Sequence, residues 1–254
     1  MKKLLAITAL SAALFFGQTA AAEEKAAEEV KPSHVEMVLV LDESGSMSDL
    51  TRDTIGGFNS MIEKEKKLDV DAHVTTVLFN DQYKMLYNRR ELKDVSKMTD
   101  KDYTPGGMTA LLDAVGRTIH KMDMVAGIHR KDKGNKVLFV IITDGEENDS
   151  KEYTYADVKK LIKDRQENAG WEFIFLGANI DAAAAAENLG IGSDRAVKYK
   201  NTGSGVRANF KAVAELSDSL AKSGRVSDEW KETVEKDEDD AADKQSAAVT
   251  LHRR

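Results

Sequence analysis

Short apolar runs alternate with longer amphipathic segments through the middle of the chain. The runs 37–41 and 137–142 are continuous and rich in β-branched residues, which is typical of strands buried on both faces of a parallel sheet. The runs 171–176 and 196–200 predict two further strands. These four segments indicate the centre of a parallel sheet.

A longer apolar run at 70–79 is followed by the turn residues Asn80 and Asp81 and then by a polar-mixed run at 83–88. Turn residues between two extended runs favour a hairpin. We therefore expect 83–88 to fold back beside 70–79 as an antiparallel edge strand. With these two, the predicted sheet has about six strands.

The segments between the strands carry apolar residues at helical spacing. Thr154 with Asp157 three residues later predicts a capping box, and Asp181 is expected to begin a short alanine-rich helix that Gly190 ends. The helical positions fall into four groups: Leu50, Ile55, Phe58 and Ile62; Leu111, Val115, Ile119 and Met122; Tyr155, Val158 and Ile162; and Val206, Phe210, Val213 and Leu220.

Strands that alternate with helices of this length predict an α/β fold. We expect a doubly wound, mostly parallel central sheet of about six strands, with helices on both faces, over residues 34–222. The charged, alanine-rich segment 23–33 is interpreted as a linker. Residues 223–254 include the acidic run EKDEDD and few large apolar residues, and are interpreted as an acidic, disordered tail without core residues.

Residues 1–22 have the layout of a secretory signal peptide. Lys2 and Lys3 precede an apolar run that is too short to span a bilayer, and the segment ends in three alanines, so cleavage is expected near Ala22. No other segment is long and apolar enough to cross a membrane. The sequence therefore predicts an exported protein, periplasmic or secreted.

Charge and cysteine content narrow the setting further. The formal charge of −7 becomes −9 without residues 1–22, because that segment holds two lysines and no acidic residue. An acidic protein is a poor ligand for nucleic acid or anionic lipid. The chain contains no cysteine, so the domain depends on its apolar core and not on disulfides.

Oxygen-bearing side chains follow the predicted strands where a doubly wound fold binds ligands. Asp42, Ser44 and Ser46 follow the first strand, Thr109 stands in a glycine-containing loop, and Asp144 follows the strand at 137–142. Two carboxylates with three hydroxyls form a hard oxygen donor set that suits Mg²⁺ or Mn²⁺ better than zinc. The sequence thus predicts a metal site built from these five residues.

These residues resemble the metal-ion-dependent adhesion site of von Willebrand factor A-type (VWA) domains. The pattern of that family is D-x-S-x-S, then a separate Thr, then a separate Asp, and all five positions are matched here. Phrases such as DTIGGFNS, GMTALLDAVG and WEFIFLGANID are similar to those of a bacterial subgroup. The resemblance covers about 35–220.

The resemblance implies a binding module and no catalysis. By position, Ser44, Ser46 and Thr109 correspond to the hydroxyl ligands, while Asp42 and Asp144 correspond to residues that act through water or charge. A partner protein would complete the coordination with a carboxylate. Because Glu43, Glu146 and Glu147 stand beside these positions, we also expect added negative charge to retain the cation and repel an acidic partner.

Three alternatives remain open from the sequence. A Mg²⁺-dependent phosphoryl-transfer enzyme would use the same strand end, but aspartate-nucleophile phosphatases need a second carboxylate where Ser44 stands. A structural exported protein with a vestigial site would fail to bind metal. A further hypothesis is metal-dependent self-association, in which the acidic tail offers a carboxylate to a neighbouring copy.

Overall fold

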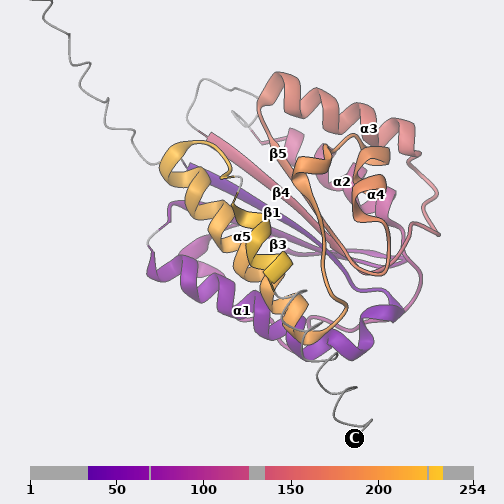
Figure 1. Ribbon diagram of the computed structural model, residues 1–254, viewed down its shortest axis with the longest axis horizontal. Coiled ribbons are helices and arrows are strands. Elements are labelled where there is room, and N and C mark those ends of the chain that lie inside the picture. The colour runs from indigo at the N-terminus through magenta and orange to yellow at the C-terminus, as the bar shows by residue number, and fades with distance from the viewer. Residues whose placement is uncertain (1–33, 69, 126–134, 228, 237–254) are drawn as a thin grey trace, which may run out of the picture. The chain divides into compact units, whose positions relative to one another are not determined.

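The structure, a computed structural model, describes residues 34–68, 70–125, 135–227 and 229–236 (Figure 1). The predicted signal peptide at 1–22, the predicted linker at 23–33 and the end of the tail from 237 lie outside the described residues. No helix within the described ranges is long and apolar enough to cross a membrane.

A single six-stranded sheet forms the centre of the fold in the order β3-β2-β1-β4-β5-β6. All six predicted strands are present, and every pair is parallel except the predicted antiparallel pair β2 and β3. This confirms the expected doubly wound α/β architecture. The bounds are β1 His34–Asp42, β2 Ala72–Phe79, β3 Tyr83–Glu91, β4 Asn135–Thr143, β5 Glu172–Gly177 and β6 Ala196–Lys198.

Helices cover both faces of the sheet (Figure 1). On one face, α1 (Thr51–Lys67) and α5 (Gly203–Ser223) bury Met37, Leu39 and Leu41 of β1. On the other, α2 (Leu111–Asp123), α3 (Tyr155–Asp164) and α4 (Ala182–Leu189) pack over Val38 and Val40. Alternate residues of β1 thus belong to two separate hydrophobic cores, one on each face of the sheet.

Local capping explains where two of the helices begin and end. The side chain of Thr154 accepts a hydrogen bond from the backbone N–H of Asp157, and the Asp157 carboxylate accepts one from the N–H of Thr154, which is the predicted capping box. Asp181 caps α4 by accepting from the N–H of Ala184 at 3.0 Å. Gly190 ends that helix with a left-handed φ of 86°.

Short irregular helices occupy several connections. They are the 3₁₀ helices η1 (Gly45–Leu50), η2 (Leu92–Asp94) and η4 (Ser193–Arg195), and the π-helical turn η3 (Arg165–Ala169). The sequence patterns do not indicate them, because segments this short show no helical periodicity. Among them, η1 contains Ser46, one of the predicted ligands.

One correction concerns the end of the domain. The sequence interpretation placed no core residues after residue 222, but Val226, Trp230 and Val234 are 6%, 2% and 1% exposed and belong to the core beside α1 and α5. Residues 230–236 are helical. Trp230 and Val234 stand four residues apart on one side of this helix, and Val226 joins the same core from the segment before it, so these three side chains dock the otherwise charged segment.

The strand order fixes where a ligand can bind. The chain crosses from β1 to β2 on one side, and the strands after β3 are added on the other side of β1. The crossovers therefore diverge between β1 and β4, and doubly wound folds bind ligands at the carboxyl ends of such strands. Asp42 and Asp144 stand at that point.

A buried carboxylate between α1 and α5 generates a stability prediction. Glu65 is 0% exposed, and its Oε2 accepts a hydrogen bond of 2.7 Å from Ser217 Oγ. Its Oε1 has no hydrogen-bond partner among the described residues. Burial raises the pKa of Glu65 from 4.5 to about 7, so the folded state holds a proton that the unfolded state releases between these pH values.

We therefore expect the free energy of unfolding to fall as pH rises from about 4.5 to 7, by roughly 3 kcal/mol. Glu65→Gln resembles the protonated form and should remove this loss, so the variant should be the more stable protein at pH 8. Urea unfolding at pH 4.5 and pH 8 measures the difference. Glu63→Gln, at an exposed position on the same helix, is the matched control, and equal pH profiles for both variants would contradict the assignment.

Candidate metal centre

The turn after β1 brings three of the predicted ligands together. Beyond Asp42 the chain curls into η1, and the N–H of Ser44 donates to Asp42 Oδ1 at 2.7 Å. This curl places Ser44 Oγ 3.1 Å from Ser46 Oγ. Ser46 Oγ in turn donates to Asp144 Oδ1 at 2.5 Å. The first and last parts of the motif, 98 residues apart in sequence, are thus in direct contact.

Thr109 approaches the same point from the loop that precedes α2. A β-carbon added to Gly145 would lie 3.7 Å from Thr109 Oγ1 and 3.9 Å from Ser46 Oγ, so both hydroxyls border the same small space. The loop is held there by Asn148, whose Oδ1 accepts from the N–H of Thr109 at 2.8 Å and whose N–H donates to Thr109 O at 3.0 Å. All five predicted site residues therefore lie at one edge of the sheet.

Glycine makes the approach of these loops possible. The N–H of Gly45 donates to Gly107 O at 3.2 Å, which joins the turn after β1 to the loop of Thr109. Gly107 has a φ of 76°, and a β-carbon there would lie 1.9 Å from Asp81 Oδ1. A residue with a side chain would be strained at this φ and would displace the exposed side chain of Asp81.

Electrostatics at the centre favour a cation. Asp42 and Asp144 are 1% and 2% exposed, and none of the salt bridges within the described part of the chain involves either carboxylate. Burial raises the pKa of Asp42, and the charge of Asp144 acts in the same direction. Two buried carboxylates without a cationic side chain fit a divalent ion, which would neutralise them.

The donor set fits Mg²⁺ or Mn²⁺. Every polar side-chain atom contributed by the five residues is an oxygen, and hard cations prefer oxygen ligands. Ser44 and Thr109 are buried, whereas Ser46 is exposed. The site therefore has one open side, from which an outside ligand can reach an ion held by the hydroxyls.

Four residues that were not among the predicted ligands contact the carboxylate or the backbone carbonyl of Asp42 or Asp144. Thr143 Oγ1 donates to Asp42 Oδ2 at 2.6 Å, and Tyr103 OH donates to Asp42 O at 2.6 Å. Asn201 Nδ2 lies 3.4 Å from Asp144 Oδ2, and Asn179 Nδ2 lies 3.4 Å from Asp144 O. Asn179 and Asn201 follow β5 and β6, so the rule that located Asp42 and Asp144 could also have found them.

The neighbouring glutamates have different roles. Glu43 is buried and accepts hydrogen bonds from the N–H and hydroxyl of Thr104, so it fixes a loop. Glu147 accepts from the N–H of Leu112 at 2.9 Å and that of Ser150 at 2.7 Å, so it anchors the start of α2. Glu146 alone is exposed beside the site. The expected repulsion of an acidic partner is thereby restricted to Glu146.

Comparison with protein families agrees with this geometry. A family described as "vWA found in TerF C terminus" matches residues 34–190, more than half of the chain. The chain belongs to this VWA family. No curated protein matches it. The family covers the whole arrangement from β1 to the end of α4, including all five predicted ligands.

Solved structures show the same fold. The VWA domain resembles the open conformation of the pilus adhesin SpaC from Lactobacillus rhamnosus GG (TM-score 0.59, 14% identity, 76% of this chain and 31% of that chain). It also resembles the PilB minor pilin from Streptococcus sanguinis (TM-score 0.53, 13% identity, 73% of this chain and 61% of that chain). A third similar structure is a von Willebrand factor type A protein from Catenulispora acidiphila (TM-score 0.51, 15% identity, 73% of this chain and 43% of that chain). The chain spans less than two thirds of each of these proteins.

The separate roles of the two glutamates can be tested by stability. Glu147→Gln keeps the shape but removes the charge that accepts the N–H groups of α2 and its neighbouring loop. We expect this variant to lose about 1–3 kcal/mol of unfolding free energy, the range for hydrogen bonds to a charged group. Glu146→Gln is the control and should change stability by less than about 0.5 kcal/mol, as exposed positions do. Equal losses in urea unfolding would contradict the anchoring role of Glu147.

Proposed function

We propose that the protein is an exported, metal-dependent binding module that holds Mg²⁺ or Mn²⁺ and engages an acidic group on a partner protein. The observation that carries this proposal is the pair of buried carboxylates, Asp42 and Asp144, which border three hydroxyls and have no cationic partner among the described residues. Ser44, Ser46 and Thr109 would hold the ion directly. The two aspartates would supply charge and accept hydrogen bonds from its water ligands.

The surroundings of the centre support recognition of a protein surface. Met108, beside Thr109, is 51% exposed and offers an apolar contact at the rim. A pocket of about 270 Å³ adjoins Gly145 and is lined by apolar and acidic side chains, including Leu111, Ile180 and Glu146. A partner that places a carboxylate at the ion can insert a neighbouring side chain here. Because Glu146 lines the pocket with a negative charge, we expect the inserted side chain of the partner to be neutral or basic.

Export and adhesion receive support from two directions. The layout of residues 1–22 is that of a signal peptide. Two proteins of the same fold are a pilus adhesin and a minor pilin. An acidic domain with an open metal edge suits recognition of another protein outside the cell better than binding of nucleic acid.

A phosphoryl-transfer activity is the alternative from another class. It would need a nucleophile or base beside the ion. The position two residues after Asp42 is Ser44, whose Oγ lies 3.1 Å from Ser46 Oγ and whose N–H is bonded to Asp42. No histidine or lysine makes a hydrogen bond or salt bridge with Asp42 or Asp144 in the described ranges. The binding role therefore accounts for more of the geometry.

Thermal unfolding in EDTA, Mg²⁺, Mn²⁺ and Ca²⁺ tests the metal site. A ligand present at a hundred times its dissociation constant should stabilise the native state by about 2.7 kcal/mol. We expect Mg²⁺ and Mn²⁺ to raise the melting temperature of the unmutated protein, and Asp42→Ala and Ser44→Ala to abolish the shift. Ser48→Ala is the control, because the exposed side chain of that serine bonds only to Gly45 O among the described residues. If no cation changes the melting temperature of the unmutated protein, these residues do not bind metal and their role is structural.

Peptide display tests the partner chemistry. Selection of random peptides in Mg²⁺ should enrich sequences that contain Asp or Glu, and EDTA should release them, because the partner's carboxylate binds through the ion. Glu146→Gln should increase the affinity of the enriched peptides for the protein, since it removes a repulsive charge at the rim. Enrichment that persists in EDTA or on the Asp42→Ala variant would argue against a metal-mediated contact. Hydrolysis of a phosphate ester that needs Asp42 would favour the enzyme.

A further inference from the structure

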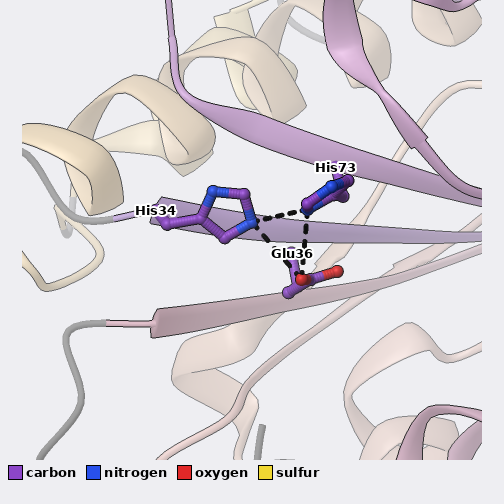
Figure 2. A group of neighbouring side chains, drawn as sticks. All are labelled: His34, Glu36 and His73. Carbon is purple, nitrogen blue, oxygen red and sulfur yellow. Dashed lines mark hydrogen bonds and ion pairs between the residues drawn. The ribbon is translucent and has the colours of Figure 1, made fainter. Parts of the chain in front are cut away.

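A second group of metal-binding side chains lies at the opposite end of β1 from the candidate metal centre (Figure 2). His34 and Glu36 come from β1, and His73 comes from β2, where it is the register partner of Glu36. Because alternate residues of a strand share a face, all three side chains lie on the face covered by α2. We call this group the amino-edge cluster.

Three potential ligand atoms in the cluster converge on one point. His34 Nε2 lies 2.8 Å from His73 Nδ1 and 3.3 Å from Glu36 Oε1, and His73 Nδ1 lies 3.4 Å from the same oxygen. Figure 2 shows the two rings and the carboxylate directed at this space. Glu36 is 2% exposed, while the histidine side chains are 19% and 26% exposed. The carboxylate thus lies on the buried side of the cluster, and the histidines lie on its solvent side.

The hydrogen-bond partners indicate which histidine nitrogen carries a proton in this space. His34 Nδ1 lies 3.0 Å from an oxygen of Asp71, and His34 Nε2 faces Glu36 and His73. Arg89 can only donate, and its guanidinium contacts both Glu36 and His73 Nδ1. In this arrangement His73 Nδ1 accepts, and both ring nitrogens of His34 face acceptors, which favours the protonated form of His34.

Neighbouring charges agree with that assignment. The hydrogen bond to Glu36 raises the pKa of His34, with Asp71 adding to the effect against the opposing influence of burial. Burial alone would raise the pKa of Glu36, but hydrogen bonds from His34 and Arg89 lower it to about 2. The charged and titratable groups that face the cluster come from β1, the start of β2, and β3: Glu36, Asp71, His73, Arg89 and Glu91.

When His34 loses its Nε2 proton, two imidazole lone pairs and a carboxylate oxygen point at one another with nothing between them. We propose that a divalent transition metal of the zinc class takes the place of that proton, with His34, His73 and Glu36 as its ligands. Binding releases the proton from His34 Nε2 and forms three metal–ligand bonds. Water supplies the fourth ligand from the solvent side.

The present distances are close to those a zinc ion requires. Zinc–ligand bonds of 2.0–2.1 Å in a tetrahedron place neighbouring ligand atoms about 3.3–3.4 Å apart. Two of the three separations, 3.3 Å and 3.4 Å, already have this length. The third, 2.8 Å between the two histidines, is that of a hydrogen bond. It must open by about half an ångström, and both rings are partly open to solvent.

Arg89 competes with the metal for Glu36. Its Nε donates to Glu36 Oε2 at 3.0 Å, while its terminal nitrogen contacts Oε1, the oxygen that the metal needs. Arg89 also has a φ of 46°, a strained conformation for a residue with a side chain. The terminal nitrogen must leave Oε1 on metal binding, and the Nε contact can remain to orient the carboxylate.

The donor set separates this cluster from the candidate metal centre. Imidazole nitrogen with one carboxylate suits Zn²⁺ and its transition-metal neighbours, whereas the centre at the other end offers oxygen alone. Excess Mg²⁺ can therefore occupy the oxygen site without filling the nitrogen site. This difference allows the amino-edge cluster to be tested independently of the proposed function.

Calorimetric titration with Zn²⁺ tests the proposal. The Asp42→Asn variant is used in excess Mg²⁺, so that zinc binding at the candidate metal centre does not contribute. Co²⁺ is a second probe, because its visible absorption reports tetrahedral coordination by nitrogen and oxygen. We expect one zinc ion per chain. His34→Gln and His73→Gln should each weaken binding by more than about 100-fold, beyond the usual effect of losing an outer partner of a ligand. His120→Gln, on the exposed side of α2, is the control and should leave binding unchanged.

Two further measurements separate a metal site from a structural ion pair. Arg89→Asn removes the competing guanidinium while suiting the left-handed backbone, so it should tighten zinc binding by at least about tenfold if the terminal nitrogen occupies the site. Below the pKa of His34, the affinity should fall about tenfold for each pH unit, because one proton is displaced. Zinc binding that is absent, or that both histidine variants retain while still folded by circular dichroism, would overturn the proposal.

Discussion

The parallel pairing of β1 with β2 on one side and β4 on the other is the constraint on which the rest of the structure depends. This pairing places Asp42 at the end of β1 beside the end of β4, where Asp144 begins the next loop. It also brings Glu36 opposite His73 at the other end. Since every residue of β1 after His34 is buried, the strand cannot shift its register without moving both groups.

Burial of charge distinguishes the two ends of β1. At the carboxyl end, Asp42 and Asp144 are buried with hydroxyl and amide partners, and the part of the chain that the structure describes places no cationic side chain against them. At the amino end, the buried Glu36 already has two cationic neighbours, Arg89 and His34. A buried charge requires compensation, so the ion proposed for the first site would supply it, while the ion proposed for the second would replace a proton.

The fold was largely predictable because its signals are local and repeated. Continuous apolar runs and helical spacing identified all six strands and the main helices, and D-x-S-x-S with its separate Thr and Asp indicated which loops meet. The docking of Trp230 was not predicted, because three apolar residues in a charged segment give a weak pattern. The support of Asp42 by Tyr103 was also missed, since a contact 61 residues apart in sequence has no periodic signal.

The amino-edge cluster shows a similar limit. Its two histidines stand 39 residues apart in different strands, and no spacing rule connects them. Only the register of β1 with β2 makes them neighbours. Histidines without a short motif carry no information about pairing, so the sequence alone did not reveal this cluster.

The two outer strands determine how this sheet can meet other chains. β3 carries Lys84, Arg89 and Arg90, and its pairing with β2 is interrupted by register shifts around Thr76. β6, at the other edge, is only three residues long. Charges, a bulge and shortness each prevent the backbone of a foreign strand from extending a sheet. The two edges of this sheet are therefore poorly suited to strand addition by another chain.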